Sequence, residues 1–245
     1  MFPWSQFSSI NTAYADIGFV DDPEAAHGIV FTLIDSGEKV LEVGCSAGYF
    51  GQKLKEKKGC TVVGVDIDPV VVELARQRTG ITVFLSRTPL PELPEEYCGF
   101  FDVIVCADVI EHTNDPWSFI RQLKKYGTKN CRFIFSIPNI AHWSCRFMLF
   151  KGEWNYQRFG ILDYTHLRFF TLRTAFLLAE ESQLDVRRAF YTSGQAMEVY
   201  QRGLFRLLKR IDLFNVTPGI LARLALRFPS LFALQFVMEC TPRAL

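Results

Sequence analysis

The chain has 245 residues, 49% of them hydrophobic and 22% charged, which is the balance of a globular protein and excludes a disordered one. Its formal net charge of +1 provides no field to attract nucleic acid, so no nucleic-acid partner is expected. Seven cysteines without C-x-x-C spacing argue against a zinc site or a disulfide framework, and they favour a reducing compartment, so the predicted location is the cytoplasm.

The first part of the chain alternates between short apolar runs and amphipathic segments, which is the pattern of strands and helices. Strands are predicted within 39–44, 60–68, 81–86, 101–112 and 131–139. Helices are predicted within 21–35, 49–59, 69–80 and 115–127. Strands joined by helices of this length imply right-handed crossovers and a parallel, doubly wound sheet, which binds ligands beyond the carboxyl ends of its strands.

Past residue 139 this alternation stops. Residues 140–170 are aromatic and irregular, and we expect them to form a lid over the ligand site. The sequence then predicts a helix at 171–183 and a strand at 184–192. Two inserted amphipathic helices are predicted within 195–229, followed by a last strand at 230–240.

The stretch "VLEVGCSAGYFG" at residues 40–51 permits two interpretations. Its centre fits G-x-S-x-G, the nucleophile elbow of an α/β-hydrolase, with Ser46 as the nucleophile. A hydrolase also needs an acid and a histidine further along, and Asp163 and His166 are available. The elbow normally follows a central strand, however, whereas this strand is the first of the predicted sheet. The second interpretation is a glycine-rich turn shaped for a nucleotide-like ligand.

Two carboxylates favour the second interpretation. Asp66 ends the second strand 18 residues after Gly48, which is the spacing of an acid that accepts hydrogen bonds from both hydroxyls of a ribose. Glu42 precedes Gly44 by two residues, and a carboxylate there would repel a pyrophosphate but suits a cationic ligand. On this interpretation Ser46 occupies the turn because it is small.

These stretches together resemble the class I S-adenosylmethionine-dependent methyltransferases over roughly residues 38–190. "VLEVGCSAGYFG" is similar to their first motif, "GVDID" to the second, "FDVIVCADVIEHTNDP" to the fourth-strand motif and "FIFSIPN" to the fifth strand. The resemblance implies S-adenosylmethionine as cofactor. The cofactor-binding residues that it implies are Glu42, Gly44, Cys45, Ser46, Gly48, Asp66, Ile67, Asp108 and Val109.

The resemblance also implies a fold. It is an α/β, doubly wound, Rossmann-like sheet of seven mostly parallel strands, with an antiparallel last strand and helices on both faces. One methyltransferase domain would cover residues 1–245. Its parts would be an N-terminal helical segment (1–37), a cofactor-binding core (38–139) and the acceptor lid (140–170). The C-terminal half of the sheet would follow at 171–245, with a helical insertion at 195–229.

The expected reaction is transfer of a methyl group to an oxygen of a small molecule or of a sugar or glycan. No Asn/Asp-Pro-Pro-Tyr/Phe motif of amino-group methylation occurs in the sequence. A histidine would take the proton of the acceptor hydroxyl, because imidazole titrates near neutral pH. His166 is favoured because Asp163 flanks it and "GILDYTHLRFFT" resembles a stretch common in methyltransferases of sugar and glycan pathways; His142 and His112 are the rivals.

Two alternatives remain open from the sequence. Glu111 and His112, in "ADVIEH", could hold a divalent ion and make the reaction metal-assisted, although the main prediction includes no metal. The chain could also be a catalytically silent cofactor-binding subunit that docks a partner through residues 195–229. Basic residues beside leucine and phenylalanine in that insertion also fit peripheral contact with an anionic membrane. No signal peptide or transmembrane segment is expected.

Overall fold

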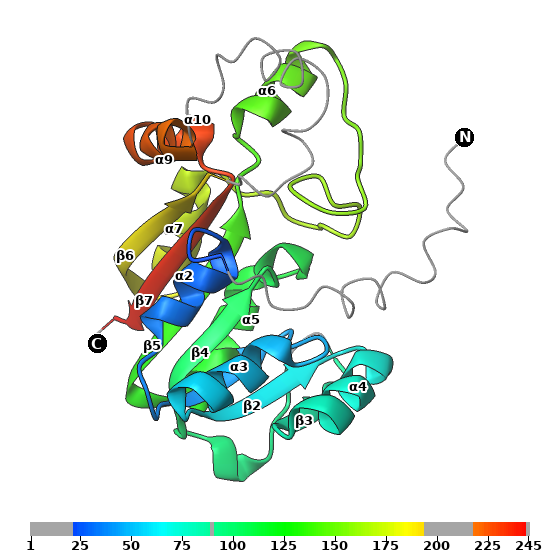
Figure 1. Ribbon diagram of the computed structural model, residues 1–245, viewed down its shortest axis with the longest axis vertical. Helices are drawn as coiled ribbons and strands as arrows, with labels where there is room; N and C mark the ends of the chain where they lie inside the picture. Colours follow the sequence, from blue (N-terminus) through cyan, green and yellow to red (C-terminus); the bar gives the residue numbers. More distant parts are fainter. Residues whose placement is uncertain (1–21, 89–90, 194–217, 244–245) are drawn as a thin grey trace.

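A computed structural model of the chain describes residues 22–88, 91–193 and 218–243. These residues form one sheet of seven strands in the order β3-β2-β1-β4-β5-β7-β6. The strands are β1 (Lys39–Val43), β2 (Thr61–Asp66), β3 (Thr82–Leu85), β4 (Phe101–Ala107), β5 (Gly127–Pro138), β6 (Leu184–Thr192) and β7 (Gln235–Pro242). Only β7 of these strands runs antiparallel to its neighbours β5 and β6, so the predicted fold class is confirmed (Figure 1).

Helices cover both faces of the sheet. One face packs against α2 (Ala26–Leu33), α3 (Tyr49–Lys58) and α4 (Pro69–Thr79). The other packs against α5 (Pro116–Leu123), α7 (Leu172–Glu181) and α9 (Pro218–Arg227). Shorter elements are α6 (Trp143–Phe150), α10 (Pro229–Phe232) and the 3-10 turns η2 (Glu95–Tyr97), η3 (Ile110–His112) and η4 (Lys124–Tyr126).

Local chemistry explains where the core helices begin and end. The carboxylate of Asp68 accepts the N–H of Val70, and Pro69 follows as the first residue of α4. Gly59 and Gly80 end α3 and α4 in the left-handed conformation, which costs glycine little. These signals are all local, and the predicted bounds of both helices agree with the structure.

Several predicted segments differ from the structure, among them the fifth strand, which was expected from 131 and begins at Gly127. The first helix was expected from residue 21, but α2 begins at Ala26 because residues 22–25 form a turn in which Ala25 N–H donates to Asp22 O. The irregular lid contains a helix, α6. The last strand begins at Gln235 rather than 230, because Pro229 starts α10.

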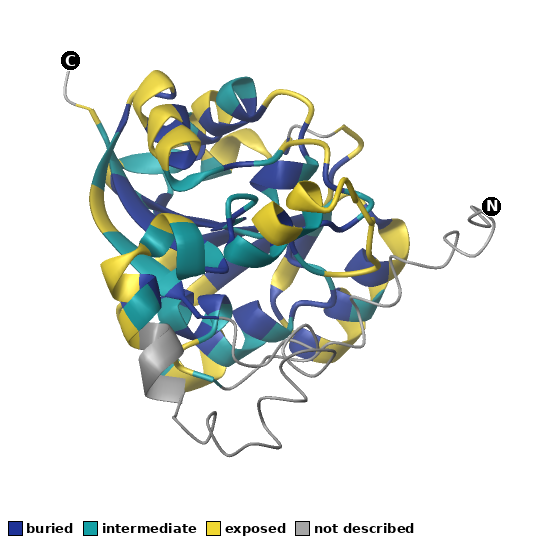
Figure 2. Cartoon of the chain, turned by 90° about the horizontal axis from the view of Figure 1, so that it is seen from above, coloured by how far each residue is buried: buried dark blue, intermediate teal, exposed yellow. Residues whose placement is uncertain are grey.

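The second half of α6 and the loop that follows it consist mostly of exposed residues, which are yellow in Figure 2. Phe150 is 87% exposed there. The first of the two predicted insertion helices lies outside the described residues, so the membrane and docking roles of 195–229 stay predictions. In the part of the chain that the structure describes, no helix has the length and apolar character needed to span a membrane.

Candidate active site

A cavity of about 740 Å³ opens at the carboxyl ends of β1, β2 and β4. Small-molecule sites have volumes of roughly 300–1,000 Å³. The strand order reverses at β1, because the chain first builds β2 and β3 on one side of it and then places β4 on the other. This switch point is where the side loops diverge and leave room for a ligand.

The loop after β1 approaches the cavity in a tight turn. Gly44 has φ 72°, and a Cβ atom on it would lie 2.5 Å from Cγ2 of Val109, so only glycine fits there. Ser46 also has a positive φ, 47°, which is uncommon for a residue with a side chain. The Oγ atom of Ser46 is buried without a hydrogen-bond partner among the described residues. The turn therefore presents backbone and small side chains to the cavity.

Asp66, at the end of β2, fastens this turn. Its Oδ2 accepts the N–H of Ser46 at 2.8 Å, and its Oδ1 accepts the N–H of Asp68 at 3.0 Å. A carboxylate oxygen accepts more than one hydrogen bond, so both oxygens can still receive hydroxyl donors from the cavity. Burial raises the pKa of Asp66, which the backbone hydrogen bonds partly offset.

Glu42 lies on β1 beneath α3 and is only 6% exposed. Its Oε2 is buried with no hydrogen-bond partner among the described residues. Burial, and then the negative charge of Asp66, raise the pKa of Glu42 to about 8, although a hydrogen bond from the backbone of Gly51 lowers it. A buried, unsatisfied carboxyl group in the wall of a cavity is suited to a cationic partner.

Asp108 follows β4 with φ 54°. Its Oδ1 accepts hydrogen bonds from Ser136 Oγ and from Gln235 Nε2, both at 2.8 Å. These donors come from β5 and β7, so three strands set the position of this carboxylate at the cavity wall. Its Oδ2 can then accept from a ligand.

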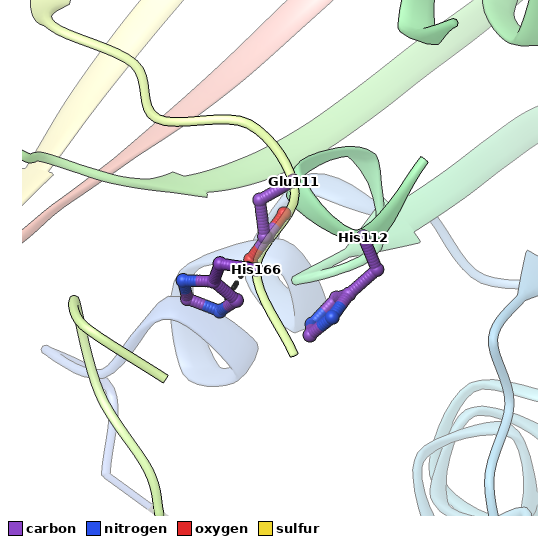
Figure 3. Close-up of side chains that lie close together, drawn as sticks. All are labelled: Glu111, His112 and His166. Carbon is purple, nitrogen blue, oxygen red and sulfur yellow. Dashed lines mark ion pairs between the residues drawn. The ribbon is translucent and has the colours of Figure 1, made fainter. Parts of the chain in front are cut away.

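Glu111, His112 and His166 form a cluster deeper along the cavity (Figure 3). One ligating atom from each lies within 4.8 Å of the others, and Nε2 of His166 is 3.9 Å from Oε1 of Glu111. Glu111 is 1% exposed, and neither of its carboxylate oxygens has a hydrogen-bond partner among the described residues. Burial, then the charge of Asp108, raise the pKa of Glu111 well above its ordinary value.

The two histidines of this cluster are both held by the lid. Nδ1 of His166 lies 3.0 Å from the carbonyl of Ile161, and Nδ1 of His112 lies 3.1 Å from Oγ1 of Thr165. Burial, with the neighbouring His112, lowers the pKa of His166. The lid is also fastened to η3, because the carbonyl of Glu111 accepts the N–H groups of two lid residues at 2.8 and 2.9 Å.

The structure brings most of the predicted site residues to the wall of this cavity: Glu42, Gly44, Cys45, Ser46, Asp66, Ile67, Asp108, Val109, Glu111, His112 and His166. Gly48 is not in the wall; it precedes α3 with φ 77° and shapes the turn instead. The roles of these residues in binding and catalysis remain predictions.

His142, a rival for the base, does not reach the cavity. It is fully buried at the start of α6, where its Nδ1 accepts the N–H of Ser144 at 3.4 Å and lies 2.7 Å from Ser144 Oγ. Burial lowers the pKa of His142 to about 4. This position fits the cap of a helix and gives the side chain no access to an acceptor.

Sequence reasoning missed several residues that hold the site together. Ser136 and Gln235 have no local signal, because strand pairing brings them to Asp108 from 28 and 127 residues away. Thr165 did have one: it lies two residues after Asp163, whose Oδ1 accepts both the N–H and the hydroxyl of that threonine, the geometry of an Asx turn.

Comparison with known families identifies the domain. The family described as "Methyltransferase domain" matches residues 21–189. That range includes the turn after β1, Asp66, Asp108 and the Glu111–His112–His166 cluster. It covers more than half of the 245 residues.

Sequence relatives have O-methyltransferase names. The ubiquinone biosynthesis O-methyltransferase of Hahella chejuensis is 31% identical over 121 residues, which are 48% of this chain and 50% of that protein. The enzyme of the same name from Pseudomonas fluorescens is 35% identical over 107 residues, or 42% of this chain and 46% of that protein. The chain thus spans about half the length of these relatives.

Solved structures share the fold. A SAM-dependent methyltransferase from Aquifex aeolicus superposes with a TM-score of 0.59 at 13% identity, over 94% of this chain and 97% of that one. Phosphoethanolamine N-methyltransferase 2 of Haemonchus contortus, solved with S-adenosyl-L-methionine, gives a TM-score of 0.57 at 13% identity, over 90% of this chain and 52% of that one. The chain therefore belongs to the methyltransferase domain family, within the class I S-adenosylmethionine-dependent methyltransferases.

Proposed function

We propose that the protein transfers the methyl group of S-adenosylmethionine to a hydroxyl oxygen of a small molecule or glycan, with His166 as the base. The observation that carries this proposal is the position of His166. It lines the same cavity as Glu42 and Asp66, and its Nδ1 is engaged by the lid backbone. Its Nε2 then keeps the lone pair that can accept a proton.

The donor end of the cavity fits the cofactor. Both oxygens of Asp66 have lone pairs left for the ribose hydroxyls. Ile67 is 64% exposed beside it, an apolar surface that the adenine would cover. Glu42 and Asp108 would face the positively charged amino-acid portion, and Oε2 of Glu42 is a buried acceptor without a partner. The sulfonium of the bound cofactor supplies an electrophilic methyl group, and the protein's task is alignment.

The base must be neutral to accept a proton. Burial lowers the pKa of His166, so its imidazole is unprotonated at neutral pH. The hydrogen bond to the carbonyl of Ile161 puts the remaining ring proton on Nδ1 and fixes the ring orientation. His166 can therefore take the proton of an acceptor hydroxyl at Nε2 as the oxygen is methylated.

The acceptor would lie between the cluster and the lid. Phe159 lines the cavity and is 37% exposed, and Trp154 and Tyr156 are exposed in the same segment. Such rings stack on flat or sugar rings. The sequence relatives, named for ubiquinone biosynthesis, support an oxygen acceptor.

A metal-assisted reaction is the second candidate, and one observation favours it. The carboxylate of Glu111 is buried with no hydrogen-bond partner for either oxygen among the described residues, and two imidazoles lie beside it. A carboxylate with two imidazoles is a ligand set for a divalent transition ion. Glu111, His112 and His166 would hold such an ion, which would bind and acidify the acceptor hydroxyl.

The test separates the two candidates. The purified protein is incubated with S-adenosylmethionine and either 3,4-dihydroxybenzoate or methyl glucoside, and mass spectrometry detects the gain of one methyl group. His166→Asn should lower turnover about 100-fold or more, as expected for loss of a general base. His142→Asn is the matched control and should stay active, because asparagine also caps helices.

The metal dependence follows from the same assay. If His166 is a metal-free base, turnover is unchanged after dialysis against EDTA. If the ion is required, turnover collapses in EDTA and returns with added Mn²⁺ or Zn²⁺. Full activity of His166→Asn would overturn both candidates, because His166 acts in each of them. Methyl transfer to the amine of phosphoethanolamine but to neither hydroxyl probe would overturn the assignment to oxygen.

A further inference from the structure

We infer that Asp163 and Thr165 of the lid fix the ring tautomer of His112, so that His112 and His166 both present an Nε2 lone pair to the acceptor site. Asp163 and Thr165 are positioning residues in this account, since neither needs to touch the substrate. The inference rests on the proposed function for its catalytic consequence, but the tautomer itself can be measured without any acceptor.

Thr165 has one hydroxyl proton and two side-chain neighbours that could share it. Its Oγ1 lies 2.6 Å from Oδ1 of Asp163 and 3.1 Å from Nδ1 of His112. In this contact the hydroxyl of Thr165 donates and the carboxyl oxygen of Asp163 accepts, so the single hydroxyl proton of Thr165 is used. The contact with His112 then needs its proton from the ring, and Nδ1 of His112 must carry that proton.

A second contact agrees with this assignment. The carbonyl of Thr165 lies 3.3 Å from the same Nδ1 atom, and a carbonyl also only accepts. Both lid groups near this nitrogen are therefore acceptors. In a neutral imidazole, Nε2 is then the nitrogen with the lone pair.

His166 reaches the same state by a different contact. Its Nδ1 lies 3.0 Å from the carbonyl of Ile161, which can only accept, so its proton is also on Nδ1. The two rings meet edge to face with their centroids 4.8 Å apart, next to the carboxylate of Glu111 (Figure 3). The lid thus sets the proton positions of both histidines, one on η3 and one on the lid itself.

Proton acceptance by Nε2 of His112 therefore requires the lid to be docked on η3. Without the hydroxyl of Thr165, Nδ1 of His112 loses the nearer of its two acceptors and keeps only the carbonyl at 3.3 Å, so the Nε2–H form becomes more populated. A protonated Nε2 can neither receive a proton from an acceptor hydroxyl nor bind a metal ion. Loss of an orienting partner of this kind typically costs about 10–100-fold in activity.

The experiment reads the tautomers directly by NMR of protein labelled with ¹⁵N-histidine. The chain has four histidines, so single substitutions assign every signal. At pH 8, where imidazoles are neutral, we expect the Nδ1–H form for His112 and His166. His142 is the internal control and should show the opposite form, because its Nδ1 accepts the N–H of Ser144.

Variants test the role of the lid residues. Thr165→Val should shift His112 toward the Nε2–H form and lower turnover about 10–100-fold. Thr165→Ser keeps the hydroxyl and should preserve both the tautomer and the turnover. Thr113→Val is the control: the hydroxyl of Thr113 donates to the carbonyl of Ile110 and contacts no histidine ring in the part of the chain that the structure describes.

Two outcomes would overturn the inference. One is a wild-type protein in which His112 carries its proton on Nε2, which decides the matter even if Thr165→Val does not fold. The other is a folded Thr165→Val variant with an unchanged tautomer. If no acceptor is methylated but the tautomers are as expected, the proposed function fails while the assignment of the lid residues stands.

Discussion

Glu42 and Asp66 place two carboxyl groups beneath one turn, and these groups differ in the hydrogen bonds that they receive. Asp66 receives two backbone N–H groups, whereas Oε2 of Glu42 receives none from the described residues. The pKa of Glu42, about 8, therefore makes its carboxyl group mostly neutral at pH 7 when no ligand is bound. A cation beside it would favour the ionised form and release a proton.

This difference predicts the pH dependence of cofactor binding. Because binding favours the ionised form of Glu42, the affinity for S-adenosylmethionine should rise as the pH increases toward 8, by up to about tenfold per pH unit. Above pH 8 the rise should end, since the carboxyl group is ionised before binding. Isothermal titration calorimetry in buffers of different ionisation enthalpy measures the affinity and the released proton.

Glu42→Gln is the control for this prediction. Glutamine keeps the shape of the side chain but cannot ionise, so its dependence on pH should reflect only the amino group of the cofactor. The same pH dependence and proton release in wild type and Glu42→Gln would show that Glu42 does not titrate on binding.

Some residues of the cavity could be proposed from the sequence, and others could not. Asp66 could be proposed as a ribose-binding residue because that role follows from a spacing along one strand–turn–helix unit. Glu111 was predicted only as an alternative ligand, because nothing in the sequence says that both of its oxygens lack partners. The contact between Thr165 and His112 joins residues 53 apart, and only the docked lid creates it.

At the scale of elements, β1 and α3 pack so closely that one helical position has no room for a side chain. A Cβ atom on Gly51 would lie 2.6 Å from Oε2 of Glu42 and 2.9 Å from Cδ1 of Ile81 and Cγ1 of Val62. Contacts this short cannot form unless the helix or these side chains shift. The close approach of α3 is what buries Glu42 below the turn.

Gly51→Ala should therefore destabilise the protein even though alanine is the better helix former. Alanine in a helix gains about 1 kcal/mol over glycine, but overpacking of a core costs roughly 1–3 kcal/mol. We expect the free energy of unfolding to fall by up to about 2 kcal/mol, measured by urea denaturation. Lys57→Ala, on the exposed side of α3, is the comparison and should change stability little. A more stable Gly51→Ala protein would mean that α3 can shift away from β1.

The predictability of elements depended on how local their signals are. Helix α4 could be located from Asp68, Pro69 and Gly80 because its cap, first residue and end are all written in the sequence. Helix α6 was missed because it has no apolar stripe: Phe147, Leu149 and Phe150 are all exposed. Such a pattern does not show the 3.6-residue period by which amphipathic helices are recognised.

At the scale of the whole molecule, the two ends of the sheet differ in character. The amino ends of its parallel strands have an ion-pair network, in which Arg132 of β5 contacts Glu38 and Glu239, each at 2.7 Å. The carboxyl ends hold the cavity, two non-glycine residues with positive φ, and buried carboxylate oxygens of Glu42 and Glu111 that have no hydrogen-bond partner among the described residues. A ligand bound at the carboxyl ends would supply partners for these oxygens.

Ligand binding should consequently raise the melting temperature of the whole chain. A ligand at 100 times its Kd stabilises the folded state by about 2.7 kcal/mol, which corresponds to roughly 5–10 °C for a domain of this size. Differential scanning fluorimetry with S-adenosylmethionine measures this shift. Asp66→Asn should reduce it at the same concentration, whereas no shift for the wild type at saturating cofactor would contradict the assignment of the site.

The fold as a whole was the most predictable part, because its topology rules apply to any strand–helix alternation. The sheet order and the antiparallel β7 agree with the expected class. What topology could not supply is the joining of Glu111 and His112 with His166 in one cluster. The sequence offered them as members of competing mechanisms, since they are separated along the chain and only the fastening of the lid to η3 brings them together.

The fastening of the lid to the carbonyl of Glu111 also bears on the order in which the substrates arrive. The carboxylates that would hold the methyl donor project from strand ends, while His166 belongs to a connecting loop. If the loop were undocked, His166 would lie away from the cavity, while the residues that would bind the methyl donor would keep their positions. The donor could then wait in the site without a base that would activate water against it. Methyl transfer would then begin only after the acceptor has bound and the loop has docked.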